Sequence, residues 1–257
     1  MNNRFLRRAG ASVIVQKLTA KAVHERKLIS EGDRILIAAS GGKDSSVMAW
    51  VLANLRQALK IDYTLEALHI SSDFCACCKK SALGALLEKW GIPFTDISVP
   101  IIGRLKEGRK MNCYWCSTQR RTELIKYAVE NGFNKIALGH HLDDIIETFF
   151  MNMTNKGTLS AMPMYLAYRK YPLCIIRPLG YLEERQIIAC ATEQNILKAA
   201  CTCPYGANSG RREIRDRIAA FTGNSGAVKR RILAALSDGD RDLLVDAGAE
   251  GEGDETH

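Results

Sequence analysis

Ser40-Gly41-Gly42-Lys43-Asp44-Ser45-Ser46 is the stretch that decides the fold of this chain. An apolar run at 34–39 precedes it, and apolar residues at helical spacing follow over 47–55. This order predicts a buried strand, a tight glycine turn and a helix. The first turn of such a helix directs free backbone N–H groups into the turn, where glycines allow close approach and Lys43 adds a charge. The stretch therefore predicts a phosphate-binding loop.

The loop differs from the two commonest glycine-rich nucleotide motifs. It lacks the four residues that separate the first glycine from Gly-Lys-Ser/Thr in the Walker loop, and it does not fit the dinucleotide fingerprint. The string from Ser40 to Ser45 instead resembles the pyrophosphate loop of the ATP pyrophosphatase (PP-loop) superfamily. That resemblance implies cleavage of ATP between its α and β phosphates and adenylation of a carbonyl oxygen. The alternative is a Gly-Gly turn with solvated charges.

Length and composition predict an ordinary globular protein. The chain has 257 residues, 47% hydrophobic and 25% charged, with no leader and no apolar run of membrane-spanning length, so we expect a cytoplasmic protein without a membrane partner. We expect four parts, which are a basic helical extension (1–28), an ATP-binding domain (29–200), a helical segment (201–237) and an acidic, disordered tail (238–257).

The net charge of +8 is unevenly placed. Residues 246–257 hold five acidic residues and no lysine or arginine, so the remainder is strongly basic. A basic body predicts a polyanionic partner such as nucleic acid. A generally basic surface without a partner is the alternative.

Strand and helix patterns alternate along the chain. Strands are expected at 34–39, 63–70, 94–99, 135–138 and 173–177, with helices between them and two short helices at 209–222 and 227–236. The predicted fold is α/β and Rossmann-like, with a five-stranded parallel sheet covered on both faces. Ligands of such sheets bind at the carboxyl ends of the strands. The glycine loop, Ile70-Ser71, a cysteine pair and Gly139 all fall at or near those ends.

Nine cysteines are many for this length, and without a signal peptide they favour metal or redox chemistry. Cys113 and Cys116 are spaced to share one metal centre, and Cys201 or Cys203 must supply a third thiol. Three cysteines would leave one iron of a [4Fe-4S] cluster without a protein ligand, whereas zinc with Cys201 as a fourth ligand is the alternative. Cys75, Cys77 and Cys78 are too close together for a standard site. Cys174 and Cys190 are predicted to be buried in the core.

Gly139-His140-His141-Leu142-Asp143-Asp144 opens a helix after a predicted strand. In the functional interpretation, Gly139 lets a nucleotide approach and an aspartate holds Mg²⁺ or ribose. In the structural interpretation, an aspartate caps the helix and the histidines pack.

Arginines follow both cysteine segments. Arg120 and Arg121 come after the first, and Arg211, Arg212, Arg215 and Arg217 after the second. They suit phosphate contacts. Pairing with Glu123, Glu213 and Asp216 on solvated helix faces is the alternative.

Taken together, these motifs resemble the tRNA 2-thiocytidine synthetase family, whose members combine a pyrophosphate loop with an iron–sulfur cluster. The matching segments also include Asn152-Met153 and Ile176-Arg177-Pro178-Leu179, and the resemblance covers residues 11–236. It implies ATP, Mg²⁺, a [4Fe-4S] cluster, a tRNA substrate, a sulfur donor (sulfide or a cysteine desulfurase persulfide) and a homodimer.

Carried onto this chain, the resemblance assigns the cluster to Cys113, Cys116 and Cys203. It gives catalytic roles to Lys43, Asp44 and Arg120, although related enzymes often have a lysine near the first cysteine pair, where this chain offers Arg120. The nucleotide would contact Ala39, Ser40, Gly41, Gly42, Lys43, Asp44, Ser45, Ile70, Gly139 and Asp144.

Other acceptors remain open. Cys201-Thr202-Cys203-Pro204-Tyr205 resembles the 2-thiouridine branch of these enzymes, but that branch has zinc-binding cysteine sets at both ends, which favours cytidine here. A PP-loop enzyme acting on another acceptor, such as a lysidine-forming enzyme, and a non-enzymatic iron–sulfur nucleotide sensor are further alternatives.

Overall fold

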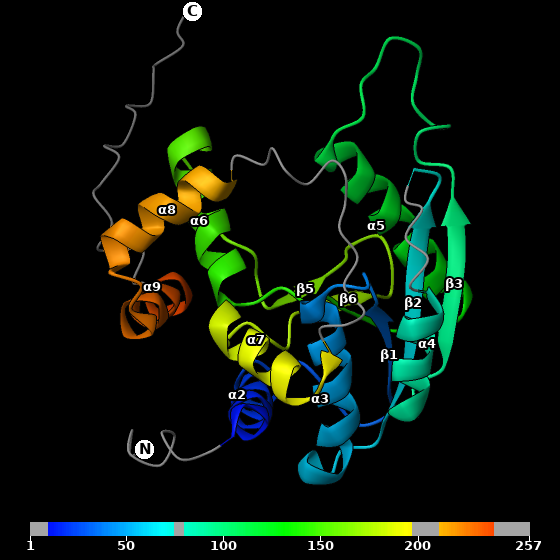
Figure 1. Ribbon diagram of the computed structural model, residues 1–257, viewed down its shortest axis with the longest axis horizontal. Helices are drawn as coiled ribbons and strands as arrows, with labels where there is room; N and C mark the ends of the chain where they lie inside the picture. Colours follow the sequence, from blue (N-terminus) through cyan, green and yellow to red (C-terminus); the bar gives the residue numbers. More distant parts are fainter. Residues whose placement is uncertain (1–9, 75–79, 197–210, 239–257) are drawn as a thin grey trace, which may run out of the picture.

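The computed structural model describes residues 10–74, 80–196 and 211–238, and they form a central sheet with helices on both faces (Figure 1). The strands are β1 (Asp33–Ala38), β2 (Tyr63–Ser72), β3 (Phe94–Val99), β4 (Lys135–Ala137), β5 (Tyr165–Ala167) and β6 (Cys174–Ile176). The helices are α2 (Ala11–Glu25), α3 (Lys43–Leu59), α4 (Lys80–Lys89), α5 (Cys113–Glu130), α6 (Leu142–Lys156), α7 (Glu184–Glu193), α8 (Arg211–Thr222) and α9 (Gly226–Asp238).

The sheet has the order β3-β2-β1-β4-β6-β5. Five of its strands are parallel, as predicted, but β5 pairs antiparallel with β6, so the expectation of five strands is wrong by one. The missed strand has only three residues, all of them exposed, and follows Pro163. A short exposed edge strand lacks the apolar alternation by which the other strands were found.

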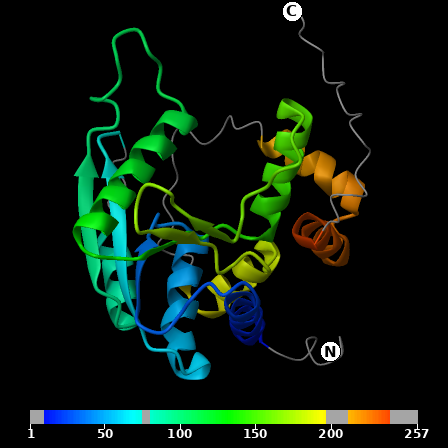
Figure 2. The same cartoon turned by 180° about the vertical axis from the view of Figure 1, so that it is seen from behind.

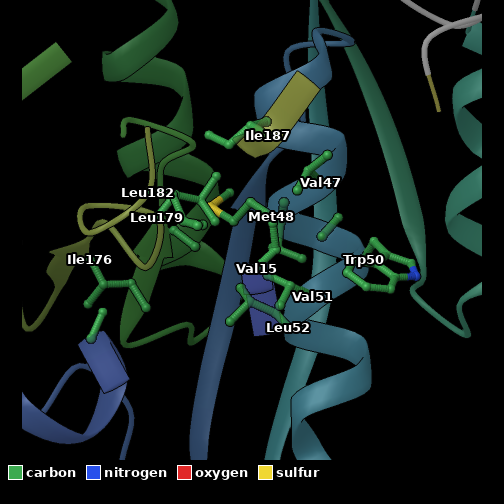
Figure 3. Close-up of a cluster of buried hydrophobic side chains, with 14 of the residues drawn as sticks. Val15, Val47, Met48, Trp50, Val51, Leu52, Ile176, Leu179, Leu182 and Ile187 are labelled. Carbon is green, nitrogen blue, oxygen red and sulfur yellow. The ribbon is translucent and has the colours of Figure 1, made fainter. Parts of the chain in front are cut away.

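Successive side chains of β1 point to opposite faces of the sheet, so the strand contributes to two apolar clusters, one on each face. Ile35 and Ile37 belong to the larger apolar cluster, with α2, α3, α6 and α7, whereas Leu36 belongs to a smaller cluster under α5. Figure 2 shows α5 lying across its face of the sheet. In the larger cluster, Met48 of α3 lies among side chains from α2 and the segment before α7 (Figure 3).

The strand order fixes where a ligand can bind. The chain runs outward from β1 through β2 to β3 and then returns to place β4 on the other side of β1. The switch point therefore lies between β1 and β4, and in open α/β sheets the ligand crevice forms there, outside the carboxyl ends of the strands. None of the helices in the described parts of the chain combines the length and apolarity needed to span a bilayer.

Candidate functional site

The glycine loop connects β1 to α3 at the switch point. Gly41 has φ +76°, a conformation that favours glycine, and Gly42 is the N-cap of α3. Two serines stabilise the turn by hydrogen bonds. The Oγ of Ser40 accepts from the Gly42 N–H (3.3 Å) and lies 2.9 Å from the Oγ of Ser45. The Oγ of Ser45 donates to the Gly42 carbonyl (3.1 Å). The loop is thus held open toward the first turn of α3, whose N–H groups suit an anion.

Gly139 brings the end of β4 against the same helical turn. A Cβ at this position would lie 2.9 Å from the backbone nitrogen of Ser45 and 3.1 Å from its Cα. Backbone atoms cannot move aside as a side-chain tip can, so only glycine fits. The two segments on either side of the switch point therefore form one wall of the site.

Lys43 forms ion pairs with two carboxylates in this site. Its Nζ lies 2.8 Å from Glu184 Oε1 on α7 and 3.2 Å from Asp44 Oδ2. Burial alone would lower the pKa of Lys43, but the two carboxylates raise it above its ordinary value. Burial would likewise raise the pKa of Glu184, but Lys43 and Arg215 lower it. Lys43 is thus a fixed, fully charged ammonium group beside the loop.

A buried histidine, His141, lies near three aspartates, which are Asp44, Asp143 and Asp144. His141 is the N-cap of α6 and is 3% exposed. Its Nε2 lies 3.4 Å from Asp144 Oδ2 and 4.0 Å from Asp44 Oδ1, and its Nδ1 lies 3.7 Å from Asp143 Oδ2. Asp144 also accepts from the His141 N–H (3.0 Å), so it serves the helix terminus while facing Asp44. The structural interpretation of this turn is correct in that respect.

Asp143 and Asp144 differ in their surroundings. Asp143 accepts from the Glu184 N–H (2.7 Å) and pairs with Lys229 of α9 (2.5 Å). Burial would raise the pKa of Asp143, but Lys229 and the Glu184 N–H lower it. Asp44, by contrast, has a buried Oδ1 with no hydrogen-bond partner in the described residues. An unpartnered buried carboxylate oxygen fits a hard cation.

A small pocket adjoins the loop on the α5 side of the sheet. It is lined by Ala38, Ala39, Ser40, Leu68, Ile70, Arg120 and Leu124. Ile70 is therefore close to the loop, although it lies 30 residues from Ser40 and 50 residues from Arg120 in the sequence. Arg120 is half-buried, and its Nε has neither solvent nor a hydrogen-bond partner in the described residues.

The cysteine pair lies on the first turn of α5, at the edge of the sheet where β3 ends. Asn112 caps the helix by accepting from the Trp115 N–H (2.8 Å), and Trp115 Nε1 donates to the Ile101 carbonyl (3.1 Å) just after β3. Cys113 is exposed and Cys116 is half-buried. A spacing of three residues places both thiols on the same side of the helix, which fits two ligands of one centre.

The other cysteines divide into three groups. Cys203, Cys201 and the three at 75–78 lie outside the described residues. Cys190 is fully buried, as predicted, and burial raises the pKa of its thiol to about 11. Cys174 is only half-buried, because it is in the strand beside the exposed β5, and its Sγ lies 2.9 Å from the Tyr165 hydroxyl. The prediction that Cys174 is a core residue is therefore wrong.

Several residues of this site were not predicted from the sequence as site residues. Glu184 and Lys229 reach Lys43 and Asp143 across 141 and 86 residues, and each is an ordinary charged residue of an amphipathic helix. Arg177, which follows β6, is 6% exposed and donates from Nε to His140 Nδ1 (3.3 Å). In the sequence, Arg177 is part of a segment that resembles the tRNA 2-thiocytidine synthetase family, but no role in the site was predicted for this residue.

Known proteins resemble this chain over most of its length. A family model described as PP-loop domain matches residues 12–220. A tRNA-cytidine(32) 2-sulfurtransferase of Syntrophotalea carbinolica is 34% identical over 91% of this chain and 92% of that protein, and one of Geobacter metallireducens is 35% identical over 84% and 86%. Among solved structures, the U34-tRNA thiolase NcsA from Methanococcus maripaludis with its [4Fe-4S] cluster superimposes with a TM-score of 0.72 at 25% identity, covering 88% of this chain and 78% of that one.

Proposed function

We propose that this chain, which belongs to the PP-loop family and within it to the tRNA-cytidine(32) 2-sulfurtransferases, uses ATP to replace the C2 oxygen of a cytidine in tRNA by sulfur. One observation carries the proposal: the phosphate loop after β1 and the cysteine pair at the start of α5 open on the same edge of the sheet. An activating group and a sulfur-delivering group can thus act on one base.

The activation step uses the loop and Lys43. The C2 oxygen attacks the α-phosphorus of ATP, the bond from that phosphorus to the bridging oxygen breaks, and pyrophosphate leaves. The N–H groups at the start of α3 and the Lys43 ammonium stabilise the charge that develops on the leaving group. A sulfur nucleophile then displaces AMP, which carries away the former C2 oxygen.

Asp44 and Asp144 are the residues that would hold Mg²⁺. Both face His141, and the buried Oδ1 of Asp44 has no hydrogen-bond partner in the described residues. When bound, Mg²⁺ supplies charge neutralisation at the phosphates. Asp143 is less suited to this role, because Lys229 and the Glu184 N–H already occupy its oxygens.

Cys113, Cys116 and Cys203 would hold a [4Fe-4S] cluster, with Cys201 as the alternative third ligand. When bound, the cluster supplies an iron without a protein ligand at which sulfur can be carried. The exposed thiol of Cys113 and the half-buried thiol of Cys116 fit such a group at the mouth of the site. Sulfide or a cysteine desulfurase persulfide as the donor, a cytoplasmic location and a homodimer complete the proposal.

The test combines product analysis with a cysteine variant. Under anaerobic conditions, the reconstituted protein is given ATP, sulfide and an unmodified tRNA transcript, and nucleosides are analysed by mass spectrometry alongside pyrophosphate release. We expect one pyrophosphate for each 2-thiocytidine. Cys113→Ser should lose iron and thiolation, whereas the matched control Cys174→Ser should keep both.

Other results would select the alternatives. Formation of 2-thiouridine would assign the protein to that branch of thiolation enzymes. Pyrophosphate release without a thiolated nucleoside would indicate another acceptor, and ATP binding without pyrophosphate release would indicate a nucleotide sensor.

A further inference from the structure

Three arginines at the carboxyl edge of the sheet have no acidic partner among the residues that the structure describes. Arg120 and Arg121 are on α5, and Arg177 follows β6. Within the described parts of the chain, no carboxylate oxygen lies within the 4.0 Å ion-pair distance of any of them. Glu123, the partner of the α5 arginines in the alternative interpretation, pairs instead with Arg104 at 2.7 Å.

Four arginines on α7, α8 and α9 are neutralised by carboxylates. Arg215 pairs with Glu147 (2.7 Å), Arg217 with Glu213 (2.5 Å), and Arg185 and Arg230 with Glu183 (3.0 and 3.1 Å). Arg120, Arg121 and Arg177 differ from these four arginines because no carboxylate among the described residues lies within ion-pair distance of them.

Hydrogen bonds from its side chain and backbone hold Arg177 in place. Its Nε donates to His140 Nδ1 (3.3 Å), its Nη1 donates to the Pro163 carbonyl (2.5 Å), and its backbone N–H donates to the Met164 carbonyl (2.8 Å). Burial and the nearby charge of Arg121 lower the pKa of Arg177 to about 10. A guanidinium that stays charged in these surroundings favours an added anion.

The strand order places these groups beside the reacting centre. His140 follows Gly139, whose Cα abuts the first turn of α3, and β6 is the next strand beyond β4. Arg121 is exposed on α5, which packs on the same face of the sheet as the segment leading into β6, and its charge contributes to the lowered pKa of Arg177. In this strand order, Gly139 at the end of β4 lies between the phosphate loop at the end of β1 and Arg177 at the end of β6.

We propose that Arg121 and Arg177 form a second anion subsite, which binds a backbone phosphodiester of the RNA substrate next to the target nucleotide. This inference rests on the proposed function. ATP phosphates already have the loop N–H groups and Lys43, whereas a base lying between the loop and the cysteine pair brings its own flanking phosphate to the neighbouring strand ends. Bidentate arginine contacts to such a phosphate position the base without reading its identity.

The experiment measures equilibrium binding of an unmodified tRNA transcript over a range of salt concentrations. Arg121→Gln should weaken binding about tenfold and reduce the slope of log K against log salt by roughly one, whereas ATP affinity stays unchanged. Arg177→Lys, which keeps the charge but not the fork, should also weaken RNA binding. The control Lys89→Gln removes an exposed charge at the end of α4, where the chain leads into the start of β3, and should change neither affinity.

A second arm identifies the phosphate. The probe is a transcript with a neutral methylphosphonate 5′ to cytidine 32, the position in the relatives' name. The wild-type protein should bind this transcript more weakly than it binds the natural transcript. The Arg121→Gln variant should bind the two transcripts equally. Loss of ATP affinity in the variant, with RNA binding intact, would assign the subsite to the nucleotide, and no change in either affinity would overturn the proposal. Thiolation by wild type in the same preparation tests the proposed function separately.

Discussion

At the residue scale, Gly139 shows how closely two strand ends approach each other in this site. Gly139→Ala would place a Cβ 2.9 Å from the Ser45 nitrogen, so the first turn of α3 must shift. We expect ATP affinity to fall by at least tenfold and stability to fall by about 1–3 kcal/mol, the usual cost of overpacking. Isothermal titration with ATP and chemical denaturation measure the two effects.

Gly84→Ala is the matched control for that substitution. Gly84 is inside α4, and its added Cβ would meet only the edge of the Phe94 ring at 3.1 Å, which a side chain can relieve. Helix propensity favours alanine there. If Gly139→Ala bound ATP as tightly as Gly84→Ala does, the close approach would have no role in nucleotide binding.

At the element scale, α6 joins the phosphate loop to the C-terminal helices. Asp143 at its start pairs with Lys229 of α9, and Glu147 one turn later pairs with Arg215 of α8. Arg215 also approaches Glu184 (3.7 Å), the partner of Lys43. A chain of alternating charges therefore runs from Lys43 to α8.

Lys229→Met tests the α6–α9 connection. It would leave the mostly buried Asp143 without its cation, so stability near pH 7 should fall by about 3 kcal/mol. Because the folded-state pKa of Asp143 is lowered, its contribution is present above the unfolded pKa and is lost as pH falls through the folded pKa. Denaturation curves between pH 7 and pH 3 should thus be less pH-dependent in the variant. Arg217→Gln, which breaks an exposed pair on α8, should match wild type, and an equal loss in both variants would contradict this account.

Sequence patterns located the elements better than the contacts between them. The glycine loop, the five parallel strands and the turn at Gly139 follow from local composition, because strand burial and helix starts leave short-range signals. The strand β5 left none, since its residues are exposed. The pairs Lys43–Glu184 and Asp143–Lys229 depend on tertiary packing between distant segments, and no spacing along a single chain encodes that.

At the scale of the whole molecule, the charged residues at the carboxyl ends of the strands differ from those at the amino ends in how far they are paired within the protein. The carboxyl edge carries Arg120, Arg121 and Arg177, which have no acidic partner among the described residues, and the buried Oδ1 of Asp44, which has no hydrogen-bond partner there. At the opposite edge, Asp33 and Lys135 are 4% and 5% exposed, and Lys135 Nζ lies 2.5 Å from Asp33 Oδ2 and 2.8 Å from the Leu28 carbonyl. Asp33 also accepts from the Ser30 N–H (2.6 Å) and from Asn134 Nδ2 (2.8 Å). The amino edge is thus satisfied internally and contributes stability.

Lys135→Met tests this division between the edges. Removing one partner of a buried pair leaves Asp33 uncompensated, so the free energy of unfolding should fall by about 3 kcal/mol. ATP affinity of the folded protein should stay unchanged, because Lys135 begins β4, whereas Gly139 and the loop lie beyond the carboxyl end of that strand. Adding Asp33→Asn should recover part of the stability, since the double variant buries no unpaired charge. A loss of ATP affinity comparable to that of Gly139→Ala would show instead that the two edges are coupled through β4.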